Sequence, residues 1–160
     1  MRVAEFMRNS SAIGKNTSIQ DAEKILASQR VKILPVLNYN RLVGVVTRGD
    51  IARALPSDAT TFSKREIRYW LDEVKVKEFM REPTTVTPDM DFFDVVGLAI
   101  KRGVYNFPVL DEGKFVGMIY EEDIVRYLAD EARRPAVKIE VNVKRQRVSF
   151  LERFIPGGAP

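Results

Sequence analysis

Apolar and polar positions follow one another along the chain in a pattern that occurs twice. Residues 3–55 and 76–128 align without a gap at an offset of 73, and 16 of the 53 aligned positions are identical. Most of the remaining apolar positions of the first unit stand opposite an apolar position of the second. A long period that occurs twice is typical of a tandem pair of small domains, because solenoids need three or more shorter units. We therefore expect two like units, packed about a pseudo-twofold axis with two related clefts.

The pattern within each unit predicts the element order β-α-β-β-α. A short helical turn and a short extended piece precede an amphipathic helix, which begins at Ser18 or Asp91 as N-cap. Two apolar strands joined by a polar turn follow, and a second helix closes the unit. The strands are predicted over 34–37, 42–46, 107–110 and 115–119, and the closing helices through 51–55 and 124–128.

The chain therefore divides into four segments. The first unit covers residues 1–55, an amphipathic linker helix lies within 56–73, the second unit covers 74–130, and a basic extension covers 131–160. A unit of about 53 residues is marginal for folding alone, so we expect the two to share a core. Alternating apolar and polar residues after Pro135 predict a strand-like C-terminal tail.

Composition narrows the possible functions. The chain of 160 residues contains neither cysteine nor histidine, which removes the commonest general base, the usual zinc ligand and the Ser-His and Cys-His nucleophile pairs. With no recognisable carboxylate pair either, we expect no enzyme and no metal site. No apolar run approaches the roughly 20 residues of a membrane helix, and no signal-peptide stretch is present. A cytoplasmic location fits these features.

The net charge of +4 is concentrated in the C-terminal extension. Residues 133–160 contain seven Lys and Arg against two Glu, whereas the rest of the chain has 19 basic and 20 acidic residues. A basic strand can bind nucleic acid or an acidic partner, and it can equally be an edge strand protected by its charge. A dimeric scaffold or nucleic-acid-associated protein is therefore the alternative function.

The segment 44–50 joins a predicted strand to a predicted helix, and two interpretations are open. Thr47 and Asp50 have the spacing of a capping box. The same geometry suits a nucleotide, because the helix N-terminus, the Thr47 hydroxyl and the Arg48 guanidinium can all donate to a phosphate. Asp50 is a pure acceptor, so it suits the two hydroxyls of a ribose.

The corresponding segment of the second unit differs at the positions that would meet a phosphate. Tyr120 replaces the threonine, and two glutamates follow it before Asp123. Carboxylates repel an anion, so we expect this cleft to be empty or to take a less negative ligand, with Asp123 still able to hold a ribose. Tyr105 and Phe107 can either stack on a base there or fill the core.

Three short motifs recur in both units or close the first. They are the opening V-x-E-F-M, the apolar-Pro-Val strand at 34–36 and 107–109, and the closing G-h-h-T-x-x-D-I at 44–51, where h is apolar. In this order the chain resembles the cystathionine-β-synthase (CBS) domain family over about two thirds of its length. The resemblance implies an α/β fold in which two CBS repeats form one Bateman module. It also implies an adenine-nucleotide ligand (AMP, ADP or ATP, with S-adenosylmethionine or NAD possible), a homodimer, and regulation of an effector protein in trans.

The resemblance also implies roles for individual residues of the first cleft. Asp50 matches the ribose-binding aspartate, and Thr47 matches the phosphate-binding residue. Lys32, three residues before Pro35, occupies a position where basic residues often contact phosphate, although it can also be a solvated surface charge. The implied lining of the adenine pocket is Ile33 and Leu34 with the backbone of Ser11, Ala12 and Ile13.

Overall fold

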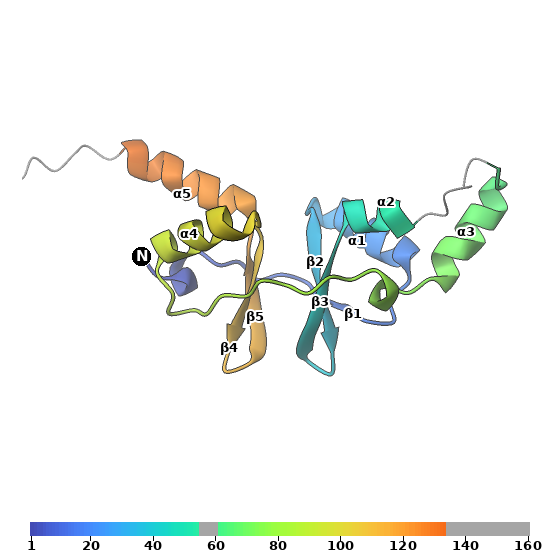
Figure 1. Cartoon of the computed structure of the whole chain (residues 1–160), viewed down its shortest axis with the longest axis horizontal. Helices are drawn as coiled ribbons and strands as arrows, with labels where there is room; N and C mark the ends of the chain where they lie inside the picture. The colour runs from blue at the N-terminus through green and yellow to red at the C-terminus, as the bar shows by residue number, and fades with distance from the viewer. Residues whose placement is uncertain (55–60, 134–160) are drawn as a thin grey trace, which may run out of the picture.

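The chain folds into two similar α/β halves that meet through their sheets (Figure 1). The computed structural model describes residues 1–54 and 61–133. The first half contains β1 (Ile13–Gly14), α1 (Ile19–Gln29), β2 (Ile33–Asn38), β3 (Arg41–Thr47) and α2 (Arg48–Ala54). The second half contains α4 (Phe92–Arg102), β4 (Phe107–Asp111), β5 (Lys114–Ile119) and α5 (Glu121–Arg133). In the sequence the linker helix α3 (Lys64–Glu73) lies between the halves, and the short 3-10 turns η1 (Val3–Glu5) and η2 (Val76–Glu78) open the two repeats.

The predicted α/β fold is confirmed, and its sheets follow the predicted order. β1 is parallel to β2, and β2 is antiparallel to β3. In the second half β4 is antiparallel to β5, and Val86 forms a parallel bridge to Val109 in the place that β1 takes in the first half. The predicted C-terminal strand lies outside the described residues.

The helices begin at the predicted caps, because a side-chain oxygen accepts a hydrogen bond from a free N–H of the first turn. The Ser18 hydroxyl accepts from the N–H of Asp21 at 3.1 Å, and the Asp91 carboxylate accepts from the N–H of Phe93 at 2.9 Å. Ser63 caps α3 in the same way, within a capping box. The starts of these three helices are therefore fixed by local chemistry.

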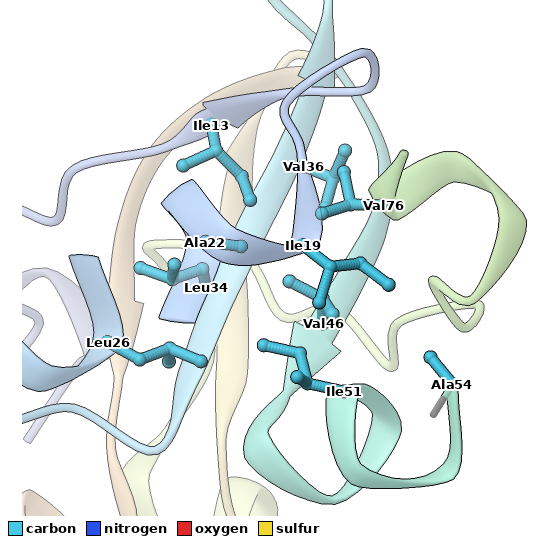
Figure 2. Packing of buried hydrophobic residues seen from close by; sticks show 10 residues of the cluster. All are labelled: Ile13, Ile19, Ala22, Leu26, Leu34, Val36, Val46, Ile51, Ala54 and Val76. Atoms are coloured by element: carbon cyan, nitrogen blue, oxygen red, sulfur yellow. The ribbon is translucent and has the colours of Figure 1, made fainter. Parts of the chain in front are cut away.

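The two halves exchange their opening turns. Val3 is fully buried in the core of the second half, and Val76 is fully buried in the core of the first, beside Val36 and Ile19 (Figure 2). The backbone crossings are held by antiparallel bridges between Arg8 and Met118 and between Arg81 and Val45. Each half is thus completed by the turn that precedes the other, and the expected sharing of a core takes this form.

A third, smaller apolar cluster joins the two sheets directly. It consists of Ile33, Val45, Met118 and Tyr120. Trp70 of α3 is half-buried against the core of the first half, with its ring 6.4 Å from that of Phe79. This packing attaches the linker helix to the core of the first half.

β3 and β5 each contain a glycine, Gly44 or Gly117, at the point where the opening segment of the other repeat passes. A Cβ atom on Gly117 would lie 2.9 Å from the backbone oxygen of Arg8, and one on Gly44 would lie 2.7 Å from the sulfur of Met80. Both distances are too short for a carbon atom. The backbone of Arg8 therefore requires glycine at 117, whereas a Cβ at 44 would force the Met80 side chain to shift.

Replacing Gly117 by alanine is expected to destabilise the protein by about 1–3 kcal/mol, because overpacking forces backbone shifts and the Arg8 oxygen belongs to a hydrogen-bonded bridge. Chemical denaturation monitored by circular dichroism measures the change. Gly97→Ala is the control, because nothing lies within 4 Å of the added Cβ on the exposed face of α4. It should stabilise by about 0.5–1 kcal/mol through helix propensity. Equal effects of the two substitutions would contradict the close crossing.

Candidate functional site

The carboxylate of Asp50 is buried where β3 passes into α2, and both of its oxygens are hydrogen-bonded. Its side chain is 3% exposed. Oδ2 accepts from the N–H of Thr47 at 2.9 Å and from its hydroxyl at 2.7 Å, while the N–H of Asp50 donates back to the Thr47 hydroxyl oxygen at 3.2 Å. The contacts of a capping box are therefore present.

The other oxygen of Asp50 faces two arginines. Oδ1 accepts a hydrogen bond from Arg53 of the same helix and forms an ion pair with Nε of Arg81 at 2.9 Å. Arg81 reaches this half only because the opening segment of the second repeat crosses to it. The side chains of Arg53 and Arg81 are 67% and 58% exposed, and Arg48 is also exposed. Because the guanidinium groups are exposed and the carboxylate is buried, they can turn toward another anion only where another donor takes their place on Oδ1.

These contacts determine the ionisation of Asp50. Burial alone would raise the pKa of the carboxyl group. The hydrogen bonds from Thr47 and the charges of Arg81 and Arg53 outweigh burial, and they hold the pKa below its ordinary value of 3.8. Asp50 is therefore an ionised acceptor at neutral pH.

The second strand–helix junction holds the equivalent Asp123, but its surroundings differ. Arg8 contacts both carboxylate oxygens, with Nε 2.9 Å from Oδ2 and a terminal nitrogen 2.7 Å from Oδ1. The N–H of Tyr120 donates to Oδ2 at 3.1 Å. The Arg8 guanidinium also lies over the Tyr120 ring, 5.1 Å from its centroid, and the Tyr120 hydroxyl is 2.7 Å from that of Ser10. Burial raises the pKa of the Tyr120 hydroxyl above 10.0, so the ring stays neutral.

A pocket of about 210 Å³ opens beside Tyr120 and draws its walls from both repeats. Lys32, at the start of β2, lies there with its Nζ 3.6 Å from Glu121. The Lys32 side chain thus lies in this pocket, although the neighbouring Ile33 pairs with Thr47 in the sheet, and its phosphate contact beside Thr47 and Asp50 stays a prediction. In this pocket the residues that precede β2 of the first repeat face the junction between β5 and α5 of the second repeat. The lining residues are Arg8, residues 29–32, Asn106, Tyr120, Glu121 and Glu122.

Two predicted ligand contacts are instead core residues. Phe107 is fully buried among the apolar residues of the second half, so stacking of its ring on a base is a wrong prediction. Leu34 is fully buried with Ile13 in the first half, so its side chain lines no cleft. Tyr105, by contrast, is 46% exposed and is no core residue. Of the other predicted lining residues, Ile33 lies in the cluster between the sheets, Pro35 is buried opposite Val45, Ala12 is half-buried and Ser11 is exposed.

Residues 1–54 and 61–133 contain neither a cluster that could hold a metal ion nor a helix that could span a membrane. Within those ranges no group of three or more acidic side chains is arranged to hold a metal ion. None of the helices there combines the length and the apolar composition needed to cross a bilayer.

The geometry just described is that of a paired domain, and comparison with known families identifies it. The CBS domain family model matches residues 3–57 and again residues 76–130. The chain belongs to the CBS domain family. Its two copies form a tandem CBS pair, or Bateman module, as the sequence motifs implied.

Several curated proteins contain a similar CBS pair within a longer chain. The uncharacterized protein MJ1225 of Methanocaldococcus jannaschii is 26% identical over 136 residues, which cover 81% of this chain and 43% of that protein. The L-aspartate semialdehyde sulfurtransferase of the same organism is 32% identical over 116 residues, 69% of this chain but 20% of the enzyme. This chain thus spans less than half the length of these relatives.

Two solved CBS pairs are similar over nearly their whole length. The CBS domain pair of protein MJ0100, crystallised with 5′-methylthioadenosine and S-adenosyl-L-methionine, is 26% identical with a TM-score of 0.67. CBSX2 of Arabidopsis thaliana, crystallised with AMP, is 25% identical with a TM-score of 0.67. Each comparison covers 82% of this chain and 98% of the other.

Sequence reasoning missed the arginines that contact the two buried aspartates. Arg8 and Arg81 both end the motif V-x-E-F-M-R, so one identical charged residue follows an apolar motif in each repeat of this CBS pair. The conservation of this arginine between the two repeats could have indicated that it has a role. Their partners could not be assigned without the crossing of the chain, because each arginine pairs with the aspartate of the other repeat.

Replacing Asp50 by asparagine is expected to lower the free energy of unfolding at pH 7 by about 1.5–3 kcal/mol, because charged hydrogen bonds to Thr47 and Arg81 are lost. A carboxyl group with a depressed pKa stabilises the fold above its unfolded pKa of about 3.8, and this contribution is lost as pH falls through the lower folded value.

Urea denaturation at pH 7 and in steps below pH 4 tests this dependence. The difference between wild type and Asp50→Asn should shrink in the acid range. Asp111→Asn, on an exposed residue at the end of β4, is the control and should change stability little at either pH. A difference that stays constant as pH falls would contradict an ionised, stabilising Asp50.

Proposed function

We propose that this CBS pair is a regulatory module that senses an adenine nucleotide in its first cleft. The observation that carries the proposal is the buried, ionised carboxylate of Asp50, beside a threonine hydroxyl and two arginines. A carboxylate accepts hydrogen bonds from both hydroxyls of a ribose. Guanidinium groups match the geometry of phosphate oxygens.

The charge around Asp50 favours an anionic ligand. Arg53 and Arg81 bring two positive charges to one carboxylate, and the exposed Arg48 begins the same helix, α2, two residues before it. In this proposal Arg53 and Arg81 leave Oδ1 and contact phosphate, while ribose hydroxyls take their place. The ligands in the two similar CBS pairs are AMP, 5′-methylthioadenosine and S-adenosyl-L-methionine, which share the adenosine group that this arrangement would hold.

Binding would be transmitted through the crossing segment. Arg81 contacts Asp50 and also forms the backbone bridge to Val45, so a ligand that draws its side chain away acts on the segment that links the halves. Couplings of this kind are typically worth about 1–3 kcal/mol. We propose that an effector protein acting in trans responds to the change, and we assign no reaction to the module.

We also propose that two copies associate through the helices of the second half. Phe93 and Ile100 lie seven residues apart on α4, and Val125 and Leu128 lie three apart on α5, so each pair shares a helix face. All four are exposed, with Ile100 at 74%. Adjacent exposed apolar residues of this kind mark protein contacts, and a second copy of the module is the proposed occupant.

A nucleotide that binds only the folded protein should stabilise it by about 2.7 kcal/mol at 100 times its Kd. Thermal unfolding with AMP, ADP, ATP, NADH and S-adenosylmethionine is expected to show this shift for at least one ligand. Asp50→Ala should abolish it, because the ribose loses its charged acceptor. Asp111→Ala is the control for an exposed carboxylate and should keep the shift.

The opposite pattern would refute the proposal. If no ligand shifts the wild-type transition, or if the shift survives in Asp50→Ala, the segment 47–50 is a helix cap without a ligand. That result would favour the alternative function, nucleic-acid binding through the basic extension. Such binding should weaken steeply between 50 and 200 mM salt.

Ile100→Glu is expected to convert the dimer to a monomer, because burying a carboxylate in an apolar interface is costly. Light scattering coupled to gel filtration measures the molar mass. Tyr39→Glu, at the 95% exposed tip of a hairpin, is the matched control and should remain dimeric. A wild-type protein that is monomeric at high concentration would contradict this interface.

A further inference from the structure

We propose that Arg8 is an internal ligand that closes the second cleft, so that each chain takes up one adenosine-type ligand rather than two. The proposal rests on the proposed function for the class of ligand, but its mechanism concerns the other cleft. The side chain that closes this cleft comes from the opposite repeat, through the exchanged opening segment.

Arg8 already occupies the groups that an adenosine would need. Its guanidinium spans both oxygens of Asp123 at 2.7 and 2.9 Å, and the Tyr120 N–H takes a further position on Oδ2. The face of the Tyr120 ring carries the same guanidinium, and the hydroxyl of that ring is paired with Ser10. A ribose would have to displace a two-pronged charged contact, and a base would have to displace a cation from the ring.

The first cleft lacks this closure. Two arginines contact Asp50 at the same oxygen, Oδ1: Arg53 of α2, and Arg81, the counterpart of Arg8, through Nε. Their side chains are 67% and 58% exposed, against 43% for Arg8. Thr47 stands in the place of Tyr120 and offers no ring over which a guanidinium can settle. Both carboxylates are buried, so the difference lies in the arginines. Contacts to one oxygen from more exposed guanidinium groups are weaker than a fork across both oxygens, so Arg53 and Arg81 yield to a ligand more readily than Arg8.

The neighbouring glutamates make the choice of probe important. Glu122 is 3.8 Å from Arg8, and Glu121 lines the same pocket. Without Arg8 these residues and Asp123 would repel a phosphate, so AMP is a poor probe of the opened cleft. Adenosine has the base and the ribose without that charge, and it tests the closure alone.

Calorimetric titration of adenosine into wild type and Arg8→Gln tests the proposal. The variant is expected to bind one more adenosine per chain than wild type, and the affinity of the second cleft should rise about tenfold or more. Arg126→Gln is the matched control, because it removes the same charge from an exposed position on α5 that lies outside the pocket. It should leave the number of sites unchanged.

The count of sites distinguishes this proposal from the proposed function. A wild type that binds no adenosine, with one site gained in Arg8→Gln, would overturn ligand binding in the first cleft and support closure by Arg8. An unchanged count in folded Arg8→Gln, or two sites in wild type, would overturn the closure. A second site gained in Glu121→Gln/Glu122→Gln with Arg8 intact would assign the exclusion to the carboxylates instead.

Arg8→Gln removes the charged partner of the buried Asp123, so the variant can fail to fold. A measurement on the wild-type protein tests the proposal in that case. In nuclear magnetic resonance spectra of wild type, the Arg8 Nε–H signal is expected to stay in place at saturating adenosine while the Arg81 Nε–H signal moves. Movement of the Arg8 signal on binding would overturn the proposal.

Discussion

The chain crosses between its two repeats at Arg8 and at Arg81, and both clefts depend on those crossings. Each crossing forms an antiparallel bridge to the last strand of the other repeat, β5 or β3, and brings an arginine to a buried aspartate. An unpaired buried carboxylate is costly, so the ion pair and the bridge stabilise the same arrangement. Gly44 and Gly117 allow it sterically, because a side chain at either position would meet the crossing segment. The exchange therefore joins the repeats, and it also determines what stands opposite each aspartate.

From this common scaffold the two clefts have diverged through a few side chains. The first keeps a threonine and an arginine before Asp50, and the guanidinium groups around it are exposed. The second has Tyr120 and two glutamates before Asp123, and Arg8 is held on the carboxylate and over the ring. The same aspartate thus stands in a site that favours an anion and in a site that already contains a cation. Duplication supplies two sites, and substitution at the strand–helix junction is enough to make them unequal.

The order of elements was predictable because helix caps and turn residues close to each element determine where it begins and ends. Ser18 and Asp91 cap helices where the apolar period begins, and the two-residue turns have the left-handed backbone at Asn40 and Gly113 that hairpins require. The exchange was not predictable from one sequence, because Val3 and Val76 are identical and fit either core equally well. The role of Phe107 was left open, because an aromatic residue in an apolar strand has the same pattern whether it faces the core or a ligand.

A crystal structure of the protein with AMP bound would test the account most directly. The account predicts AMP in the first cleft alone, with its ribose hydroxyls on Asp50, its phosphate near Arg53 and Arg81, and the pair between Arg8 and Asp123 intact in the second cleft. Density for AMP against Asp123 with Arg8 displaced, or AMP bound without contact to Asp50, would contradict it.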